Sequence, residues 1–134
     1  KSNMTMVNEE EVIMVMDGAS SGRVERGHKG ILGSTLAKIE CKNHLNYTFI
    51  YHFLKILQDE IKQNTTGTSI PHADKGRIER YKTVIPEKSV LNEFEKISNQ
   101  ILHKIISDKQ EIKILSQIRN SLLPRLMSGK IRVK

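Results

Sequence analysis

The sequence lacks tryptophan, holds one cysteine, Cys41, and contains only 4% aromatic residues. A single cysteine forms no internal disulfide, so we expect a reducing, cytoplasmic environment. No run of about 18 apolar residues is present, and we therefore expect no membrane-spanning helix. The opening residues also lack the apolar stretch of a secretion signal. Hydrophobic residues make up 37% of the 134 residues, which predicts a thin core and an apolar surface that needs a partner.

Motifs for catalysis or metal binding are scarce. No two histidines show the His-x-x-x-His spacing with a nearby glutamate that zinc enzymes use. The segment DGASSG, residues 17–22, is rich in glycine but lacks the Gly-x-x-x-x-Gly-Lys pattern of a phosphate-binding loop. We predict a protein without catalytic residues, metal or cofactor, and keep a nucleotide-dependent enzyme built on residues 17–22 as an alternative. The five histidines are His28, His44, His52, His72 and His103.

Positive charge is in excess. The formal net charge is +7 and the isoelectric point is about 9.6, which favours a polyanionic partner over a merely basic soluble protein. Up to Val90 the chain carries 13 Lys and Arg against 11 Asp and Glu, and from Leu91 onward it carries 9 against 4. The excess is therefore densest in the C-terminal part.

The N-terminal part has the patterns of strands followed by a helix. Residues 1–11 read as a frayed end, and the apolar run VIMVM, residues 12–16, predicts a short buried strand. Residues 31–41 predict a second strand. Apolar residues at helical spacing between Ile50 and Ile61 predict a helix with Asn46 as its N-cap. Alternation in residues 77–86 predicts another strand, closed by Pro86.

From Ser89 the pattern is helical for about thirty residues. An apolar stripe runs along this helix, Pro124 begins a new turn, and Gly129 ends it. At about 1.5 Å per residue the helix is longer than ~40 Å. A domain of ~90 residues is too small to cover the whole apolar stripe, so the stripe needs a second helix or another copy of the chain. The predicted interface residues are Phe94, Ile97, Ile101, Ile105, Ile112, Leu115 and Ile118.

We therefore predict an α+β fold with two parts. Residues 1–88 form a small mixed domain, and residues 89–134 form a long coiled-coil type helix and a tail. Two polar, basic segments of the first part, around ASSGRVERGHKG and TTGTSIPHADKG, offer hydroxyl, imidazole and cationic groups that suit phosphate oxygens and base edges. Ordinary surface loops without a ligand are the alternative. The candidate DNA contacts are Ser20, Ser21, Arg23, Lys29, Thr66, Thr68, Ser69, His72, Lys75 and Arg77.

Four segments resemble the specificity subunit of type I restriction–modification systems. GILGSTLAKIE is similar to a strand segment of its target recognition domains, and TGTSIPHADKGRIERYKTVIP resembles the segment that closes such a domain. LNEFEKISNQI is similar to the helix that follows. LSQIRNSLLPRLMSGKIRV resembles the C-terminus of that subunit and is the most specific match. The resemblance covers residues 12–134.

The resemblance implies part of a DNA-recognition subunit without catalytic activity. Such a subunit reads a bipartite site in double-stranded DNA through two recognition domains, which two long antiparallel helices join. It positions a methyltransferase subunit that modifies adenine with S-adenosylmethionine, and a separate restriction subunit cuts DNA. This chain is similar to the C-terminal part, with one recognition region that is shortened at its start. An adaptor whose long helix pairs with another copy remains the alternative.

Overall fold

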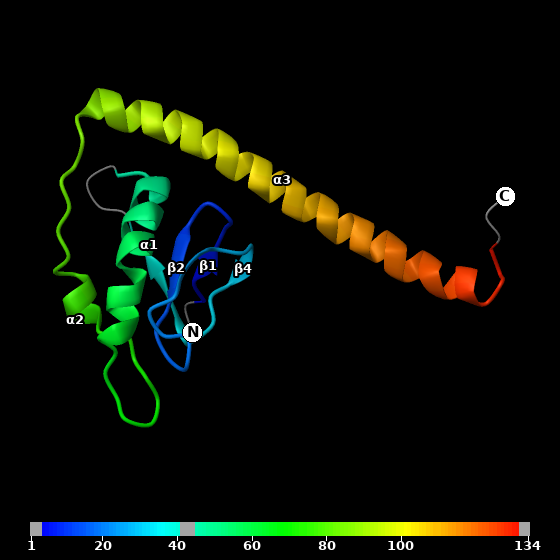
Figure 1. Ribbon diagram of the computed structural model, residues 1–134, viewed down its shortest axis with the longest axis horizontal. Helices are drawn as coiled ribbons and strands as arrows, with labels where there is room; N and C mark the ends of the chain where they lie inside the picture. The colour runs from blue at the N-terminus through cyan, green and yellow to red at the C-terminus, as the bar shows by residue number, and fades with distance from the viewer. Residues whose placement is uncertain (1–3, 41–44, 132–134) are drawn as a thin grey trace. The chain divides into compact units, whose positions relative to one another are not determined.

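The structure is a computed structural model that describes residues 4–40 and 45–131. Its first part combines short strands with a helix, and a long helix follows (Figure 1). The predicted α+β class is confirmed. The elements are β1 (Met6–Val7), β2 (Val12–Val15), β3 (Val24–Arg26), β4 (Gly30–Ile31), β5 (Leu36–Ile39), α1 (Tyr47–Gln63), α2 (Lys75–Ile78) and α3 (Lys88–Met127).

The strands form two antiparallel sheets. The larger sheet has the order β3-β2-β5, so β2 is central and Met14 lies opposite both Val24 and Ala37. β1 and β4 form a separate two-stranded pair. Residues 1–11 were expected to be frayed, but Val7 of β1 is buried and pairs with Gly30. The predicted strand at residues 31–41 is divided into β4 and β5, because a turn from Gly33 to Leu36 interrupts it.

The core lies between the larger sheet and α1. Val12 and Met14 of β2 are fully buried, as expected for a central strand with the apolar run VIMV. They meet Leu54 and Ile61 of α1, which lie two helical turns apart on one face of that helix. The complete cluster is Val12, Met14, Val24, Leu54, Ile61 and Ala73.

The start of α1 is fixed by the predicted N-cap. The side chain of Asn46 accepts a hydrogen bond from the backbone N–H of Thr48 at 2.7 Å, which satisfies one of the free donors of the first turn. Thr48 itself is buried. Cys41 and His44 lie outside the described residues.

The strand predicted at residues 77–86 is wrong. Residues 75–78 form the short helix α2, and residues 81–87 have no regular secondary structure. The reason is local, because the side chain of Asp74 accepts a hydrogen bond from the N–H of Arg77 at 3.0 Å and so caps a helical turn. Alternation of apolar and charged residues did not reveal this cap.

The helix α3 is longer than the sequence pattern predicted. It contains 40 residues, and Pro124 lies inside it instead of beginning a new turn. Proline removes one N–H donor, yet the carbonyl of Pro124 still accepts from Ser128 at 3.1 Å. Gly129, with φ of 71°, ends the helix as predicted.

The chain divides into two compact units, Lys1–Ser98 and Asn99–Lys134. The first contains the sheets, α1, α2 and the start of α3, and the second contains the rest of α3. Among the described residues, no helix combines the length and the apolar character needed to cross a bilayer.

Candidate nucleic-acid interface

Two loops that are distant in sequence lie together at one end of the larger sheet. The first loop, residues 17–23, connects β2 to β3, and the second loop, residues 66–72, lies between α1 and α2 (Figure 1). The N–H of Gly18 donates to the carbonyl of Pro71 at 2.9 Å. The side chains of Asp17 and His72 meet at 2.5 Å between Oδ1 and Nδ1. These two contacts, which we call the clamp, hold the first loop against the second loop.

The second loop is closed by its own backbone. Thr66 and His72 exchange two hydrogen bonds, with N···O distances of 2.8 and 2.7 Å. Gly67 has φ of 93°, and a Cβ at this position would stand 2.4 Å from the carbonyl oxygen of Ile70. Only glycine fits this turn, so the five-residue tip is compact.

The predicted contacts of the second loop are accessible. Thr66, Thr68, Ser69 and His72 are all exposed, and His72 is half exposed even though its ring contacts Asp17. Hydroxyl and imidazole groups both donate and accept hydrogen bonds. The clamped loop therefore presents four polar side chains that suit phosphates or base edges.

The two predicted cations on α2 differ in how strongly they are held. Lys75 is 80% exposed and lies 3.8 Å from Glu79, a loose surface pair. Arg77 contacts Glu60 at 3.4 Å. Hydrogen bonding with Tyr81, and then with Glu60, raises the pKa of Arg77 above its ordinary value. Lys75 is thus the freer of the two charges.

The first loop presents fewer of its predicted contacts. Ser20 is exposed, but Ser21 is only 4% exposed and its N–H donates to the carbonyl of Gly18. Burial removes the Ser21 side chain from this surface, a correction to its selection as a contact. Arg23 is exposed and forms an ion pair with Glu25 at 3.0 Å. Lys29 is exposed in the connection between β3 and β4, at the opposite end of β3 from the first loop, so the structure does not bring Lys29 to the two loops.

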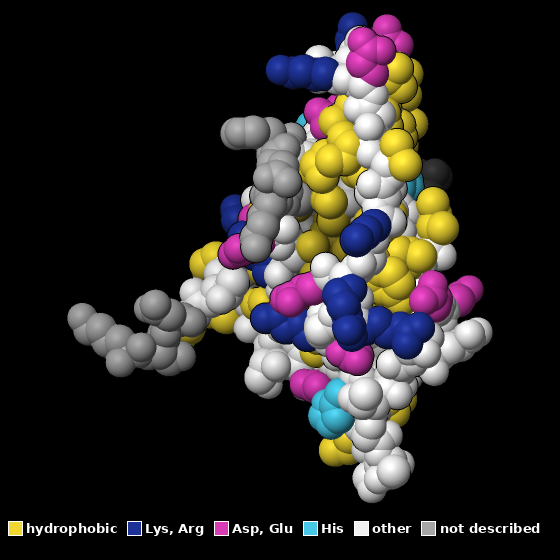
Figure 2. Space-filling model, turned by 90° about the vertical axis from the view of Figure 1, so that its left-hand side faces the viewer, with side chains coloured by type: hydrophobic (Ala, Val, Ile, Leu, Met, Phe, Trp, Pro, Cys, Tyr) yellow, Lys and Arg dark blue, Asp and Glu magenta, His cyan; other side chains and the backbone are white. Residues whose placement is uncertain are grey.

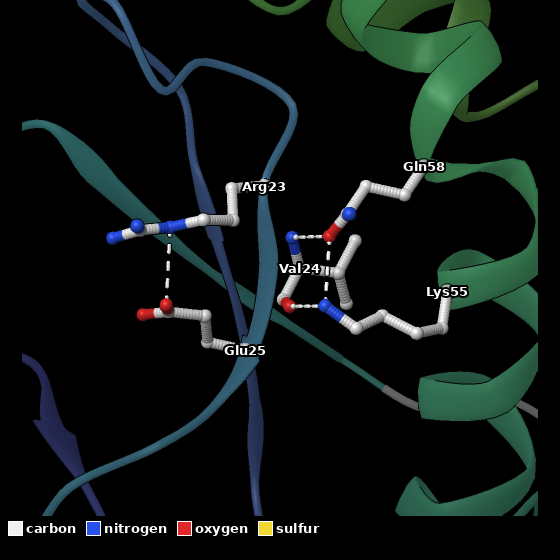
Figure 3. A network of polar contacts seen from close by, with 5 residues as sticks. All are labelled: Arg23, Val24, Glu25, Lys55 and Gln58. Carbon is white, nitrogen blue, oxygen red and sulfur yellow. Dashed lines mark hydrogen bonds and ion pairs between the residues drawn. The ribbon is translucent and has the colours of Figure 1, made fainter.

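A polar network that sequence reasoning missed supports the end of the first loop. The N–H of Val24 donates to Oε1 of Gln58, and Nζ of Lys55 donates to the carbonyl of Val24, both at 2.9 Å (Figure 3). Since β3 is an edge strand, these α1 side chains satisfy backbone groups that no neighbouring strand reaches. The sequence signal for this network is the spacing of Lys55 and Gln58, because polar residues three positions apart lie on the same face of a helix.

Basic side chains gather on the face that carries α2. Figure 2 looks onto the side where α2 lies in Figure 1 and shows Lys and Arg side chains together, with Asp and Glu among them. The local segment supplies Lys75, Arg77, Arg80 and Lys82, all exposed. The charge of this face is mixed, and its cations lie next to the second loop in sequence.

The apolar stripe of α3 is exposed in the single chain. Ile101 is 57% exposed and Ile112 is 62% exposed, whereas Phe94 is 37% exposed and its ring contacts that of His52 at a centroid distance of 5.9 Å. Asp108, which interrupts the stripe, contacts Lys104 at 2.6 Å. All seven predicted interface residues have at least a third of their surface accessible.

Among the described residues, no group of three or more His, Cys, Asp or Glu side chains is arranged so that it could hold a metal ion.

Known proteins resemble this chain over most of its length. A family model described as the type I restriction modification DNA specificity domain matches residues 1–123. Two specificity subunits of Methanocaldococcus jannaschii, those of the type I restriction enzymes MjaVIII and MjaIX, are each 30% identical. The matches cover 92% and 98% of this chain but 29% and 31% of the relatives. The chain therefore spans about a third of their length.

A solved structure has the same fold. The crystal structure of the S subunit of a type I restriction–modification system from M. genitalium matches with a TM-score of 0.64 and 21% sequence identity. The match covers 96% of this chain and 35% of that one.

Proposed function

The chain belongs to the family of type I restriction modification DNA specificity domains, and on that premise we propose that it recognises one half of a bipartite site in double-stranded DNA. The observation that carries the proposal is the clamp between the first and second loops. Two separate segments with exposed hydroxyl, imidazole and cationic groups meet at one end of the sheet. Polar groups that the fold already holds in place lower the cost of loop ordering when they contact DNA.

The proposed contact set follows the exposed residues of both loops and of α2. Thr66, Thr68, Ser69 and His72 form its centre, and Lys75 supplies a more accessible charge than Arg77. Cations next to such a loop contact phosphates, which fixes the register of the protein on the duplex. The remaining proposed contacts are Ser20, Arg23 and Arg77.

In this proposal the two parts of the chain have separate tasks. Residues 1–88 contact DNA, while residues 89–134 act as a spacer and a docking surface for a methyltransferase subunit, to which a restriction subunit is added. The chain itself performs no chemistry. A co-purification experiment with a type I methyltransferase subunit, followed by titration with duplex DNA, tests both tasks. A chain that binds neither the subunit nor DNA would contradict the proposal.

A second candidate role, self-association through α3, is supported by a regular seam. Between Ile101 and Leu126, residues at alternating steps of four and three are apolar except at Asp108 and Arg119. Such a heptad seam is typical of helices that pair. The seam residues are Ile101, Ile105, Asp108, Ile112, Leu115, Arg119, Leu122 and Leu126.

The two polar seam residues are placed symmetrically. Asp108 and Arg119 are equally far from the midpoint between Lys113 and Ile114. A second copy that runs antiparallel about this midpoint would place each Asp108 opposite an Arg119. The same register would pair Ile112 with Leu115, Ile105 with Leu122 and Ile101 with Leu126, so every apolar seam residue would face another. Polar seam residues commonly set register in this way.

A further inference from the structure

The tip of the second loop carries one large apolar side chain. Ile70 is 56% exposed and follows the exposed residues Thr68 and Ser69. Isolated exposed hydrophobic residues are common on protein surfaces, so exposure alone gives Ile70 no role. What sets Ile70 apart is how firmly the surrounding backbone is held.

The backbone of Ile70 is fixed on both sides. Its carbonyl oxygen lies against Gly67, where a Cβ would come within 2.4 Å. The next residue, Pro71, accepts a hydrogen bond from Gly18 at 2.9 Å, and the closing pair of Thr66 and His72 holds the base of the tip.

The side chain of Ile70 is stiff as well. A β-branched residue has few χ1 rotamers, and a residue that precedes proline is restricted to extended backbone angles. Ile70 thus offers an apolar surface of defined position, and little conformational entropy is lost when a ligand contacts it.

We propose that Ile70 contacts the 5-methyl group of a thymine in the major groove and so makes thymine preferred at one position of the half-site. The proposal rests on the proposed DNA-binding function. Thymine is the base that presents an apolar group in the major groove, and the remaining base edges are polar. The hydroxyls of Thr68 and Ser69 match those polar edges at adjoining positions.

Contact with a methyl group fits the exposure of Ile70 better than insertion between base pairs. A wedge that unstacks a base step must project almost its whole side chain into the duplex. Nearly half of the surface of Ile70 is covered by its own chain, which leaves its outer part for a contact on a base edge.

The test replaces thymine by deoxyuridine, which differs only by the methyl group. The half-site is first defined by mapping methylated adenines in the complex with the methyltransferase subunit, and each thymine is then replaced singly. Loss of one buried methyl group should weaken binding about fourfold at one position. Ile70→Ala should show the same loss on the thymine duplex and no further loss on deoxyuridine. Ile56→Ala, at an 82% exposed isoleucine of α1, is the matched control.

Two results would overturn the role of Ile70. They are equal binding of thymine and deoxyuridine at every position, and a rise in 2-aminopurine fluorescence on binding that Ile70→Ala removes, which would identify a wedge. If the parent complex binds no duplex at all, the proposed DNA-binding function fails, and the role of Ile70 fails with it.

Discussion

The carboxylate of Asp17 contacts the imidazole of His72 at 2.5 Å although 55 residues separate them in the sequence. Around this contact, Gly18 donates to Pro71 and Ala73 donates to the carbonyl of Met16, at 2.9 and 2.8 Å. The end of β2 therefore holds the base of the second loop through both backbone and side chain. Asp17 acts as a positioning residue in the proposed interface.

Removal of the Asp17 carboxylate should loosen the second loop. For Asp17→Ala we expect faster amide hydrogen exchange in residues 66–72 and DNA binding weakened roughly twofold to tenfold, the value of one hydrogen bond. Asp59→Ala, which removes an exposed carboxylate of α1, is the control. Unchanged exchange and unchanged affinity in Asp17→Ala would show that the backbone bonds alone hold the loop.

The cations of α2 should set part of the salt dependence of DNA binding. Together, Lys75→Ala and Arg77→Ala should lower the slope of log affinity against log salt concentration by ~1–2 units. Lys75 should account for more of this change, because Arg77 is already held by Tyr81 and Glu60. Titrations of the assembled complex at several salt concentrations measure the slope, with Lys109→Ala on α3 as control. If the double variant has the same slope as the parent, neither Lys75 nor Arg77 contacts DNA.

The ion pair between Glu11 and Lys38 should make the stability of the fold depend on pH. A hydrogen bond from Lys38 is the main cause that lowers the pKa of Glu11 from its ordinary value of 4.5. The same bond raises the pKa of Lys38. Stabilisation by Glu11 is therefore present above pH 4.5 and is lost as the pH falls through the lowered folded-state pKa. Stabilisation by Lys38 is lost only as the pH rises through its raised folded-state pKa, in the alkaline range.

Thermal unfolding measured against pH checks this assignment. Glu11→Gln should lower Tm by a few degrees at neutral pH, and its curve should converge with that of the parent in acid. Glu9→Gln, two residues earlier in the same acidic run, should leave the curve unchanged. Parallel curves for Glu11→Gln and the parent down to strong acid would contradict the sign of the shift.

Charge reversal tests the antiparallel seam of α3. Asp108→Arg and Arg119→Asp should each weaken self-association, because each places like charges opposite one another in the proposed register. The double variant should restore association to near the parent level. Sedimentation at tens of micromolar measures it, with Lys109→Asp as a charge-reversal control outside the seam. Additive losses in the double variant, or a parent that stays monomeric, would rule out this register.

Local patterns in the sequence identified several elements correctly. The run VIMV had the composition of a buried central strand, and Asn46 had the position of an N-cap. The polar composition of residues 65–76 indicated a loop between two helical stretches, although Ala73 of this segment is buried in the core. Each of these properties depends on residues close together in the chain, which is why the sequence alone revealed them.

Long-range contacts and competing local signals escaped prediction. No pattern in the sequence links Asp17 to His72 or Val24 to Gln58, since the fold brings these partners together over 55 and 34 residues. At residues 75–78 the cap at Asp74 outweighed an alternation that resembled a strand. The burial of Ser21 likewise follows from tertiary packing and not from its polar neighbours.

The most direct measurement is a map of methylated adenines made with the chain assembled with its methyltransferase subunit, once for the parent and once for Thr68→Ala combined with Ser69→Ala. If the clamped loops read DNA, the parent methylates adenines within a defined half-site sequence, and the variant relaxes the sequence requirement of that half-site. An identical methylated sequence for parent and variant, at equal efficiency, would contradict the account.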